Sequence, residues 1–236
     1  MTVGCTECET GRRRPRFGAA AWSALVLLAG SACTAEPPPD PTRQVGEAAR
    51  PSYEVRLDSE SSDPGQFELV EDDDGIRIQT GPAGIAYRTD DVMQSGDFRV
   101  EATFVQYDAP VGYREAYGIF VGGIDLDGPD LEYTYLLVRP TGDFLVKRRI
   151  GEITETLQDW TPHDAVRSVR AEGDEPRNTL AVAVLNGETN FEVNGVVVHT
   201  QSSGRVRPYG VAGVRANHRL DVRVDEFLLA SLSTEP

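Results

Sequence analysis

Cysteine, lysine and tryptophan are scarce in this chain of 236 residues. Two of its three cysteines lie within the first eight residues, so neither a disulfide framework nor a zinc ribbon can be built. Basic residues number 23 against 38 acidic ones, and the formal net charge is −15. This deficit excludes a nucleic-acid-binding protein and a polybasic surface for anionic lipid, because both need a surplus of Lys and Arg.

Several catalytic and structural motifs are also missing. The histidines, His163, His199 and His218, show no metal-ligand spacing, and the chain has neither an HExxH nor a GxSxG sequence. Gly81-Pro-Ala-Gly84 is followed by neither Lys-Ser/Thr nor a helical pattern, so it is not a phosphate loop. Since no repeat of 20–50 residues is visible, a propeller is not expected.

The first 32 residues have the layout of a secretory signal peptide. Arginines from Arg12 to Arg16 precede an apolar run, Phe17–Gly30, that is shorter than the about 20 residues of a membrane-spanning helix. Gly30-Ser-Ala-Cys33 resembles the lipobox of bacterial lipoproteins, with Gly30 where Leu is usual. The resemblance implies export to the cell envelope, at the outer membrane or cell surface, and a membrane anchor through acylated Cys33. A plain signal peptide is the alternative.

Residues 33–52 are predicted to form a flexible tether. They include Pro37-Pro38-Pro39-Asp40-Pro41 and almost no apolar side chain, so they have no face to bury. Without residues 1–32 the chain has 19 basic and 36 acidic residues, a net charge of −17, which favours a soluble exported domain. Residues 53–232 are expected to form that domain.

Residues 53–232 are predicted to be all-β. Polar and apolar side chains alternate in several segments: Tyr53–Leu57, Ile76–Ile78, Phe98–Phe104 and Leu220–Val224. Turn signals separate about thirteen such strands, and Asn186-Gly187 and Asn194-Gly195 suit tight hairpins. No segment has helical periodicity, although residues 156–166 could hold a single helical turn. Such a chain must close two antiparallel sheets over one core.

One hairpin and the closing strands resemble a known superfamily. Phe191-Glu-Val-Asn-Gly-Val-Val-Val-His199 resembles the F-x-V-N-G-x-x-V hairpin of concanavalin A-like lectin/glucanase domains, including laminin-G-like ones. Tyr209–Arg215 and Leu220–Leu229 resemble the last two strands of such a domain. Asp74-Gly75, with Gly96-Asp97-Phe98 opening a long strand, is similar to bacterial 3-keto-glycoside hydrolase-like domains. The resemblance implies a jelly-roll sandwich of two curved antiparallel sheets, a fold that serves lectins, glycosidases, lyases and adhesive modules alike.

An acidic cluster lies between the predicted strands 116–121 and 132–139. Its members are Asp125, Asp127, Asp130 and Glu132. Carboxylates two residues apart on a strand lie about 7 Å apart, near the spacing of glycosidase pairs, so these are the candidate catalytic acids of a hydrolase. Gly128-Pro129 break the strand, and the Glu-x-Asp-x-Glu pattern of the superfamily's glucanases is not matched. A turn with hydrated carboxylates is therefore favoured, and calcium held by Asp125 and Asp127 is a third interpretation.

Aromatic side chains are the candidate glycan contacts. Sugar rings stack on aromatic faces while their hydroxyls bond to nearby polar groups. The candidates are Tyr113, Tyr117, Tyr133, Tyr135 and Trp160. For each tyrosine the alternative is ordinary packing within a sheet, and for Trp160 it is closure of one end of the sandwich.

Lys147-Arg148-Arg149 forms a basic run at the end of a predicted strand. Charges there protect a sheet edge from self-association; the alternative is contact with carboxylated or sulfated sugars. Three functions stay open for the whole chain. We favour a lipid-anchored, non-catalytic carbohydrate-binding or adhesive module; the alternatives are a surface glycoside hydrolase and an envelope scaffold that binds protein.

Overall fold

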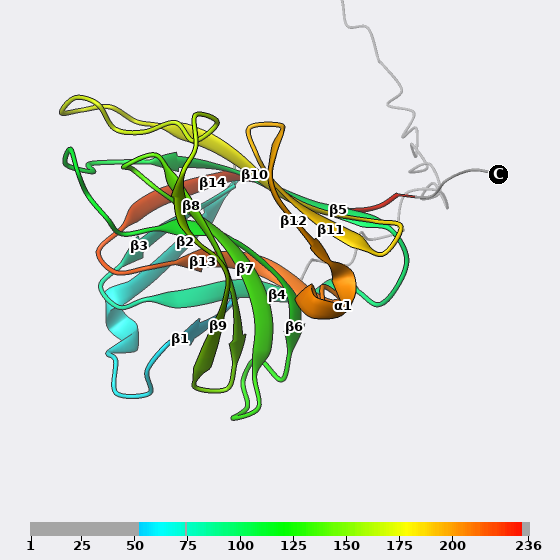
Figure 1. The fold of residues 1–236 in the computed structure, drawn as a ribbon. Helices are drawn as coiled ribbons and strands as arrows, with labels where there is room; N and C mark the ends of the chain where they lie inside the picture. Colours follow the sequence, from blue (N-terminus) through cyan, green and yellow to red (C-terminus); the bar gives the residue numbers. More distant parts are fainter. Residues whose placement is uncertain (1–51, 74, 233–236) are drawn as a thin grey trace, which may run out of the picture. The chain divides into compact units, whose positions relative to one another are not determined.

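The computed structural model describes residues 52–73 and 75–232. These residues contain fourteen strands and two short helices, joined by turns and loops. The strands form two antiparallel seven-stranded sheets that lie face to face (Figure 1). Buried side chains from both sheets fill the space between them. The predicted all-β sandwich of two antiparallel sheets is thus confirmed.

Sheet A has the strand order β1-β4-β13-β6-β7-β8-β9. Its strands are, in that order, β1 (Glu54–Leu57), β4 (Gly84–Met93), β13 (Gly210–Ala216), β6 (Tyr117–Ile124), β7 (Glu132–Arg139), β8 (Asp143–Ile150) and β9 (Ile153–Pro162). The edge strands of this sheet are therefore β1 and β9, and β8 lies inside it.

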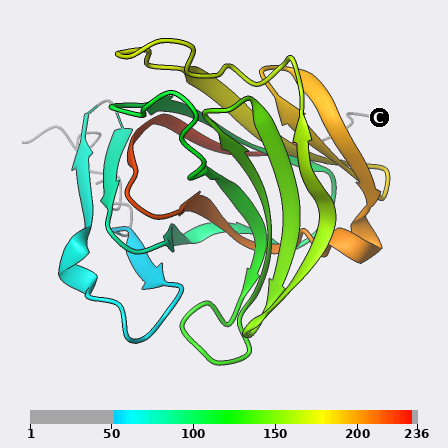
Figure 2. The ribbon, with the colours of Figure 1, turned by 60° about the vertical axis from the view of Figure 1, so that its left-hand side comes forward.

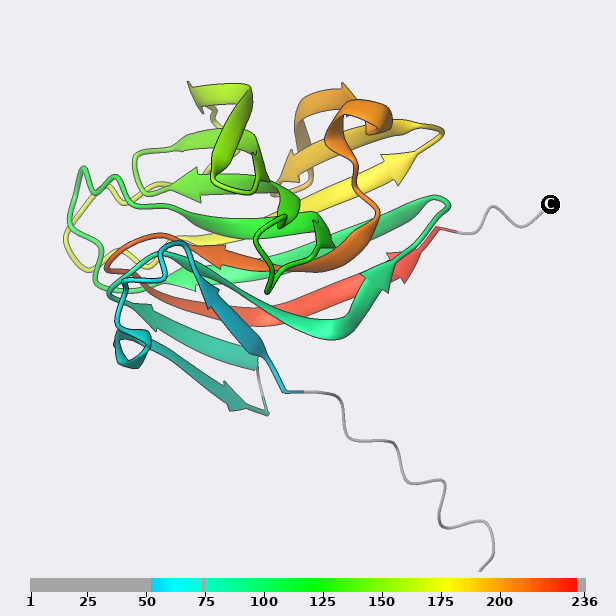
Figure 3. The same cartoon turned by 90° about the horizontal axis from the view of Figure 1, so that it is seen from below.

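Sheet B has the order β12-β11-β10-β5-β14-β3-β2. Its strands are, in that order, β12 (Val196–Ser202), β11 (Glu188–Val193), β10 (Arg177–Leu185), β5 (Phe98–Gln106), β14 (Asp221–Ser231), β3 (Gly75–Thr80) and β2 (Phe67–Asp72). Figure 3 shows the β2–β3 hairpin and the β10–β12 strands at opposite ends of this sheet. The 3-10 helix η1 (Pro64–Gln66) leads into β2, and the helix α1 (Ser203–Val206) follows β12.

Alternation of side chains decides which face of each strand is buried. In β5, Phe98, Val100 and Phe104 are at most 1% exposed and face the shared core, while Arg99 and Glu101 face outward and form an ion pair. Both predicted Asn-Gly turns join neighbouring strands, β10 to β11 and β11 to β12. All four turn residues have positive φ, between 50° and 81°, as a tight hairpin requires.

One local prediction is corrected. A hydrogen-bonded turn does lie at residues 163–166, where the Val166 N–H donates to the His163 carbonyl at 3.0 Å, but residues 156–162 belong to β9, which runs through Trp160 and ends at Pro162. Proline is tolerated there because β9 is an edge strand and one side of its backbone needs no donor.

The N-terminal predictions lie outside the described residues. These are the signal peptide 1–32, the acylation site Cys33 and the tether 33–52 apart from Ser52. In the part of the chain that is described, no helix has the length and apolar character needed to cross a membrane.

Candidate functional site

Sheet A is buried on both of its faces. The inner face packs on sheet B, and the outer face holds a second cluster of buried side chains. The aromatic members of this second cluster are Tyr87, Phe120, Tyr133 and Tyr135, with Trp160 packed against them. Apolar residues on both faces explain the nearly continuous apolar run of β7.

The outer face of sheet A is the inside of a curve. Asp58 follows β1 and still pairs with the start of β4, because its N–H donates to the Ala83 carbonyl at 2.9 Å. Its carboxylate nevertheless lies 2.7 Å from Nη1 of Arg149 on β8, although four strands stand between β1 and β8. Five inter-strand spacings span about 24 Å in a flat sheet, more than the two side chains can bridge. Sheet A is therefore curled, and we call this side its concave face.

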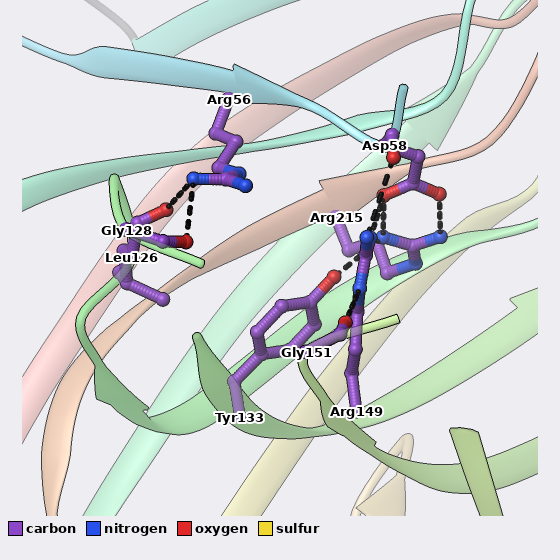
Figure 4. A network of polar contacts seen from close by, with 8 residues as sticks. All are labelled: Arg56, Asp58, Leu126, Gly128, Tyr133, Arg149, Gly151 and Arg215. Carbon is purple, nitrogen blue, oxygen red and sulfur yellow. Dashed lines mark hydrogen bonds and ion pairs between the residues drawn. The ribbon is translucent and has the colours of Figure 1, made fainter. Parts of the chain in front are cut away.

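Asp58 accepts hydrogen bonds from two arginines on the concave face (Figure 4). Arg215 of β13 donates from Nη1 and Nη2 to the two carboxylate oxygens, at 2.9 and 2.5 Å. Its Nη1 also donates to the Tyr133 hydroxyl at 2.9 Å, and its guanidinium lies 4.9 Å from the centre of the Tyr135 ring. Arg149 donates from Nη1 to Asp58 at 2.7 Å and from Nε to the Gly151 carbonyl at 2.9 Å. We call Asp58, Tyr133, Arg149 and Arg215 the concave-face network.

The network stays charged at neutral pH. Burial raises the pKa of Asp58, but the hydrogen bonds and charge of Arg215, together with Arg149, outweigh it and hold that pKa below its ordinary 3.8. Burial lowers the pKa of Arg215, but its interactions with Tyr133 and Asp58 leave that pKa raised. Two guanidinium groups and one carboxylate sum to one positive charge, in a chain whose net charge is −15.

The loop between β6 and β7 closes one end of the concave face. Arg56 of β1 donates to the carbonyls of Leu126 and Gly128 at 2.9 and 3.1 Å, so the edge strand and the loop are fixed together. Figure 2 shows this green loop beside the blue segment that carries β1. A cavity of about 400 Å³ lies here, with Arg56, Asp58, Ser59, Phe67 and Asp127 among its lining residues.

The four predicted acids do not converge on one point. Asp125 caps the turn, since its carboxylate accepts the Asp130 N–H at 3.1 Å. Asp127 accepts the Tyr87 hydroxyl at 2.8 Å at the rim of the concave face. Glu132 faces the opposite side of sheet A from Tyr133, and pairs with Arg148 and Arg207 at 2.5 and 3.0 Å.

The segment is therefore the turn that Gly128-Pro129 predicted, and it does not present the predicted pair of facing catalytic carboxylates. Within residues 52–73 and 75–232, no group of three or more His, Cys, Asp or Glu side chains could hold a metal ion. Asp125 and Asp127 thus have no third ligand of that kind for calcium.

The structure separates the five predicted aromatic contacts. Tyr133, Tyr135 and Trp160 share the concave face. Tyr117 instead faces the core, where Asn178 donates to its hydroxyl at 3.2 Å and burial raises its pKa to about 12. It is 1% exposed, so it is not available to a ligand. Tyr113 lies in the β5–β6 loop and donates to the Arg219 carbonyl at 2.7 Å, which places it at another hollow.

Trp160 is half-buried at the β9 side of the concave face. The Arg139 guanidinium lies 4.2 Å from the centre of its ring, a cation–π contact. Arg139 also donates to Asp143 at 2.9 Å, and this hydrogen bond holds the pKa of Asp143 below its ordinary value.

Two residues of the network, Asp58 and Arg215, were not predicted as site residues, and Arg149 was named only in the alternative interpretation of the basic run Lys147-Arg148-Arg149. Arg215 interrupts the apolar run of β13, and a charge in such a run needs a buried partner. That signal gives the position of Arg215 but not its partner, which lies 157 residues away. The predicted edge role of Lys147-Arg148-Arg149 is wrong, because β8 pairs with both β7 and β9.

A larger hollow, of about 880 Å³, lies beside the β2–β3 hairpin. The three arginines that line it all form ion pairs: Arg88 with Glu71, Arg177 with Asp225, and Arg223 with Asp72 and Asp225. Two aromatic residues line it: Tyr53 is covered by Arg88, whose guanidinium lies 4.1 Å from the ring centre, and Phe227 packs against the core.

Comparison with known proteins gives structural matches only. No family model and no curated protein sequence matches the chain. The carbohydrate-binding module CBM66 from Bacillus subtilis is similar with a TM-score of 0.52 and 10% identity, over 75% of this chain and 95% of that chain. The Ca²⁺-bound exoplasmic/lumenal domain of VIP36 is similar with a TM-score of 0.55 and 12% identity, over 83% and 90%. The metal-free carbohydrate recognition domain of Emp46p gives 0.51 and 10%, over 77% and 89%. At these identities the likeness establishes a fold: the chain is a β-sandwich of the lectin-like, jelly-roll kind.

Proposed function

We propose that the protein is a non-catalytic carbohydrate-binding module whose ligand lies on the concave face of sheet A. The observation that carries this proposal is the half-buried Trp160 ring on the same face as the half-buried cations Lys147 and Arg149, above the buried rings of Tyr133 and Tyr135. Aromatic rings pack against the C–H faces of sugars, while charged groups bond to sugar hydroxyls.

The floor and the accessible surface of this site are made by different residues. Tyr133 and Tyr135 are 1% and 5% exposed, so they form the floor that supports the site and, like Tyr117, offer no ring surface to a ligand. Trp160, Lys147 and Arg149 are half-buried and offer ring and cation surface to a ligand. Arg215 holds both floor rings before a ligand arrives, Tyr133 by a hydrogen bond and Tyr135 by a cation–π contact, so little side-chain entropy is lost on binding.

The fold supports the same proposal. Two of the similar structures are named as a carbohydrate-binding module and a carbohydrate recognition domain. The separation of the predicted acids supports binding without catalysis, since glycoside hydrolysis needs two carboxylates that face each other across the scissile bond. Calcium at the β6–β7 loop is not needed by this proposal, and binding is to be measured with and without it.

The test is a binding screen of the purified protein on an array of oligosaccharides, followed by calorimetry and by an assay of each binder for breakdown products. We expect binding without breakdown. Trp160→Ala should weaken it about tenfold, as the loss of a stacked ring predicts. Tyr107→Ala is the matched control: Arg77 lies 5.0 Å from the centre of the Tyr107 ring in a similar cation–π contact.

The control distinguishes a binding site from a general effect of losing an aromatic ring. Arg77 and Asp221, its partner, belong to sheet B, so Tyr107 lies away from the concave face. Equal losses in both variants would contradict a site at Trp160. Breakdown products would favour the glycoside hydrolase, and the absence of any glycan ligand would favour a protein-binding scaffold.

We also propose that the domain is exported and held at the cell envelope by a lipid on Cys33. The basic, apolar and small-residue segments that precede Cys33 support this.

A further inference from the structure

We infer that the ligand of the concave face is an acidic sugar, whose carboxylate or sulfate group is bound by Lys147. This inference rests on the proposed function and names its ligand class. Lys147 is the only lysine of the chain. On β8 it lies directly opposite Tyr135 of β7, and Arg149 lies directly opposite Tyr133, so both cations share the concave face with the two tyrosines.

The Lys147 ammonium has no counter-ion in the described part of the chain. It is half-buried, yet it makes no hydrogen bond or ion pair with any described residue. Its neighbours on the same face are Tyr135, Thr156, Leu145 and Arg149, and none of them is acidic. The acid next to Thr156 on β9, Glu155, is opposite Arg148 and pairs with Arg205 at 2.9 Å.

The arginines of the network do not replace Lys147 as the anion-binding group. Arg149 is occupied by Asp58 and by the Gly151 carbonyl, and both terminal nitrogens of Arg215 are occupied by Asp58. They still contribute one net positive charge close to Lys147. A partly desolvated cation beside a second positive charge is stabilised by a nearby anion. Among the described residues, the nearest carboxylate of the network, Asp58, is already taken up by the two arginines, and no acid pairs with Lys147.

A sugar acid can contact both the aromatic ring of Trp160 and the ammonium of Lys147. Its ring packs beside Trp160, and its carboxylate or sulfate accepts from the ammonium, with the Thr156 hydroxyl directly across from Lys147 in the register. A neutral sugar would leave Lys147 without a counter-ion. An anion without a sugar ring would not contact the aromatic part of the face.

The test uses an array of galactose, glucose and mannose oligosaccharides, each in neutral, uronic-acid and sulfated forms. We expect the acidic forms to bind about tenfold more tightly than the neutral form of the same backbone. Calorimetry then compares the tightest acidic ligand with its methyl ester or its desulfated form. The two acidic sets show whether the anion is a carboxylate or a sulfate.

Lys147→Gln should remove this preference, and Lys147→Arg should keep most of it. Arg170→Gln is the control for net charge, because Arg170 is exposed in the β9–β10 loop and its substitution should change nothing. Lys147 makes no bond within the described chain, so its variants should melt at the wild-type temperature.

The two proposals fail in different ways. If glycans bind and Trp160→Ala weakens them, but neutral forms bind as tightly as acidic ones, the acidic-sugar inference is overturned and the carbohydrate-binding proposal stands. An acidic preference that survives in Lys147→Gln also overturns it. If no glycan binds, or if Trp160→Ala has no effect, the proposed function itself fails.

Discussion

Two arginine–aspartate pairs in this protein have similar geometry and different surroundings. Arg215 and Asp58 form a bidentate pair on the concave face, where the arginine side chain is 9% exposed. Arg77 and Asp221 form a bidentate pair on sheet B, at 2.8 and 2.7 Å, where the arginine side chain is 47% exposed. The exposed guanidinium can turn to water when its partner is lost, but the buried one cannot.

Asp58→Asn should therefore lower the free energy of unfolding by about 3 kcal/mol, because it leaves the charge of Arg215 buried without an anion. Asp221→Asn should lower it by about 1 kcal/mol or less. Urea denaturation at pH 7 measures both. Equal losses in the two variants would show that Arg215 finds water or another partner, and that the concave face is more open than its burial indicates.

Among the strands and turns, the two Asn-Gly hairpins offer a second matched pair. Asn186 and Asn194 both have φ near 50° and both precede a glycine. The Asn194 side chain accepts the Thr179 N–H at 2.9 Å and donates to the Ala165 carbonyl at 2.7 Å, which links the β11–β12 turn to β10 and to the segment after β9. The Asn186 side chain makes no comparable bond among the described residues.

Asn194→Ala should therefore destabilise the protein by about 2 kcal/mol more than Asn186→Ala. Both variants lose the same tolerance of positive φ, so the difference isolates the side-chain hydrogen bonds. Thermal and urea unfolding of the two variants give the comparison. If they unfold alike, the bonds of Asn194 contribute nothing beyond the shape of the turn.

Strands and turns could be predicted from the sequence because their signals are local. Alternation located β1, β3, β5 and β14, and the Asn-Gly pairs located two hairpins. The end of the β9 strand was not predicted because Trp160-Thr161-Pro162 is typical of a turn. Proline is acceptable in this strand only because β9 lies at the sheet edge.

The candidate site was predicted only in part because its contacts are long-range. Tyr133, Tyr135 and Trp160 stood out by residue type. Asp58 and Arg215 meet only because sheet A curls and brings the end of β1 over its concave face. Which face Tyr117 occupies depends on the strand register, which residue type alone does not give.

At the scale of the whole chain, the acidic domain and the basic, apolar N-terminus serve different predicted roles. Lipid on Cys33 would place the binding face at the cell envelope. Cells that express the protein and are fed radiolabelled palmitate should label it, and Cys33→Ala should abolish the label. Cys5→Ala should leave the label intact, because that cysteine precedes the predicted cleavage site. Labelling that persists in Cys33→Ala would refute the anchor.

Stability of the folded domain should fall steeply in acid. The Arg139 and Arg77 hydrogen bonds hold the pKa values of Asp143 and Asp221 below their ordinary 3.8, and Arg215 does so for Asp58 against the effect of burial. A carboxyl whose pKa is lower in the folded state stabilises the protein above its unfolded pKa, and this contribution is lost as the pH falls through the folded pKa. The free energy of unfolding should thus be maintained from pH 7 to about pH 5 and drop below about pH 4.

The Asp58→Asn variant, which is already less stable at pH 7, should lose less free energy of unfolding over this pH range than the wild type, because one of the titrating groups is gone. Parallel losses in the two proteins would mean that Asp58 is not held ionised by Arg215, and the fixed charge of the concave face would have to be reassigned.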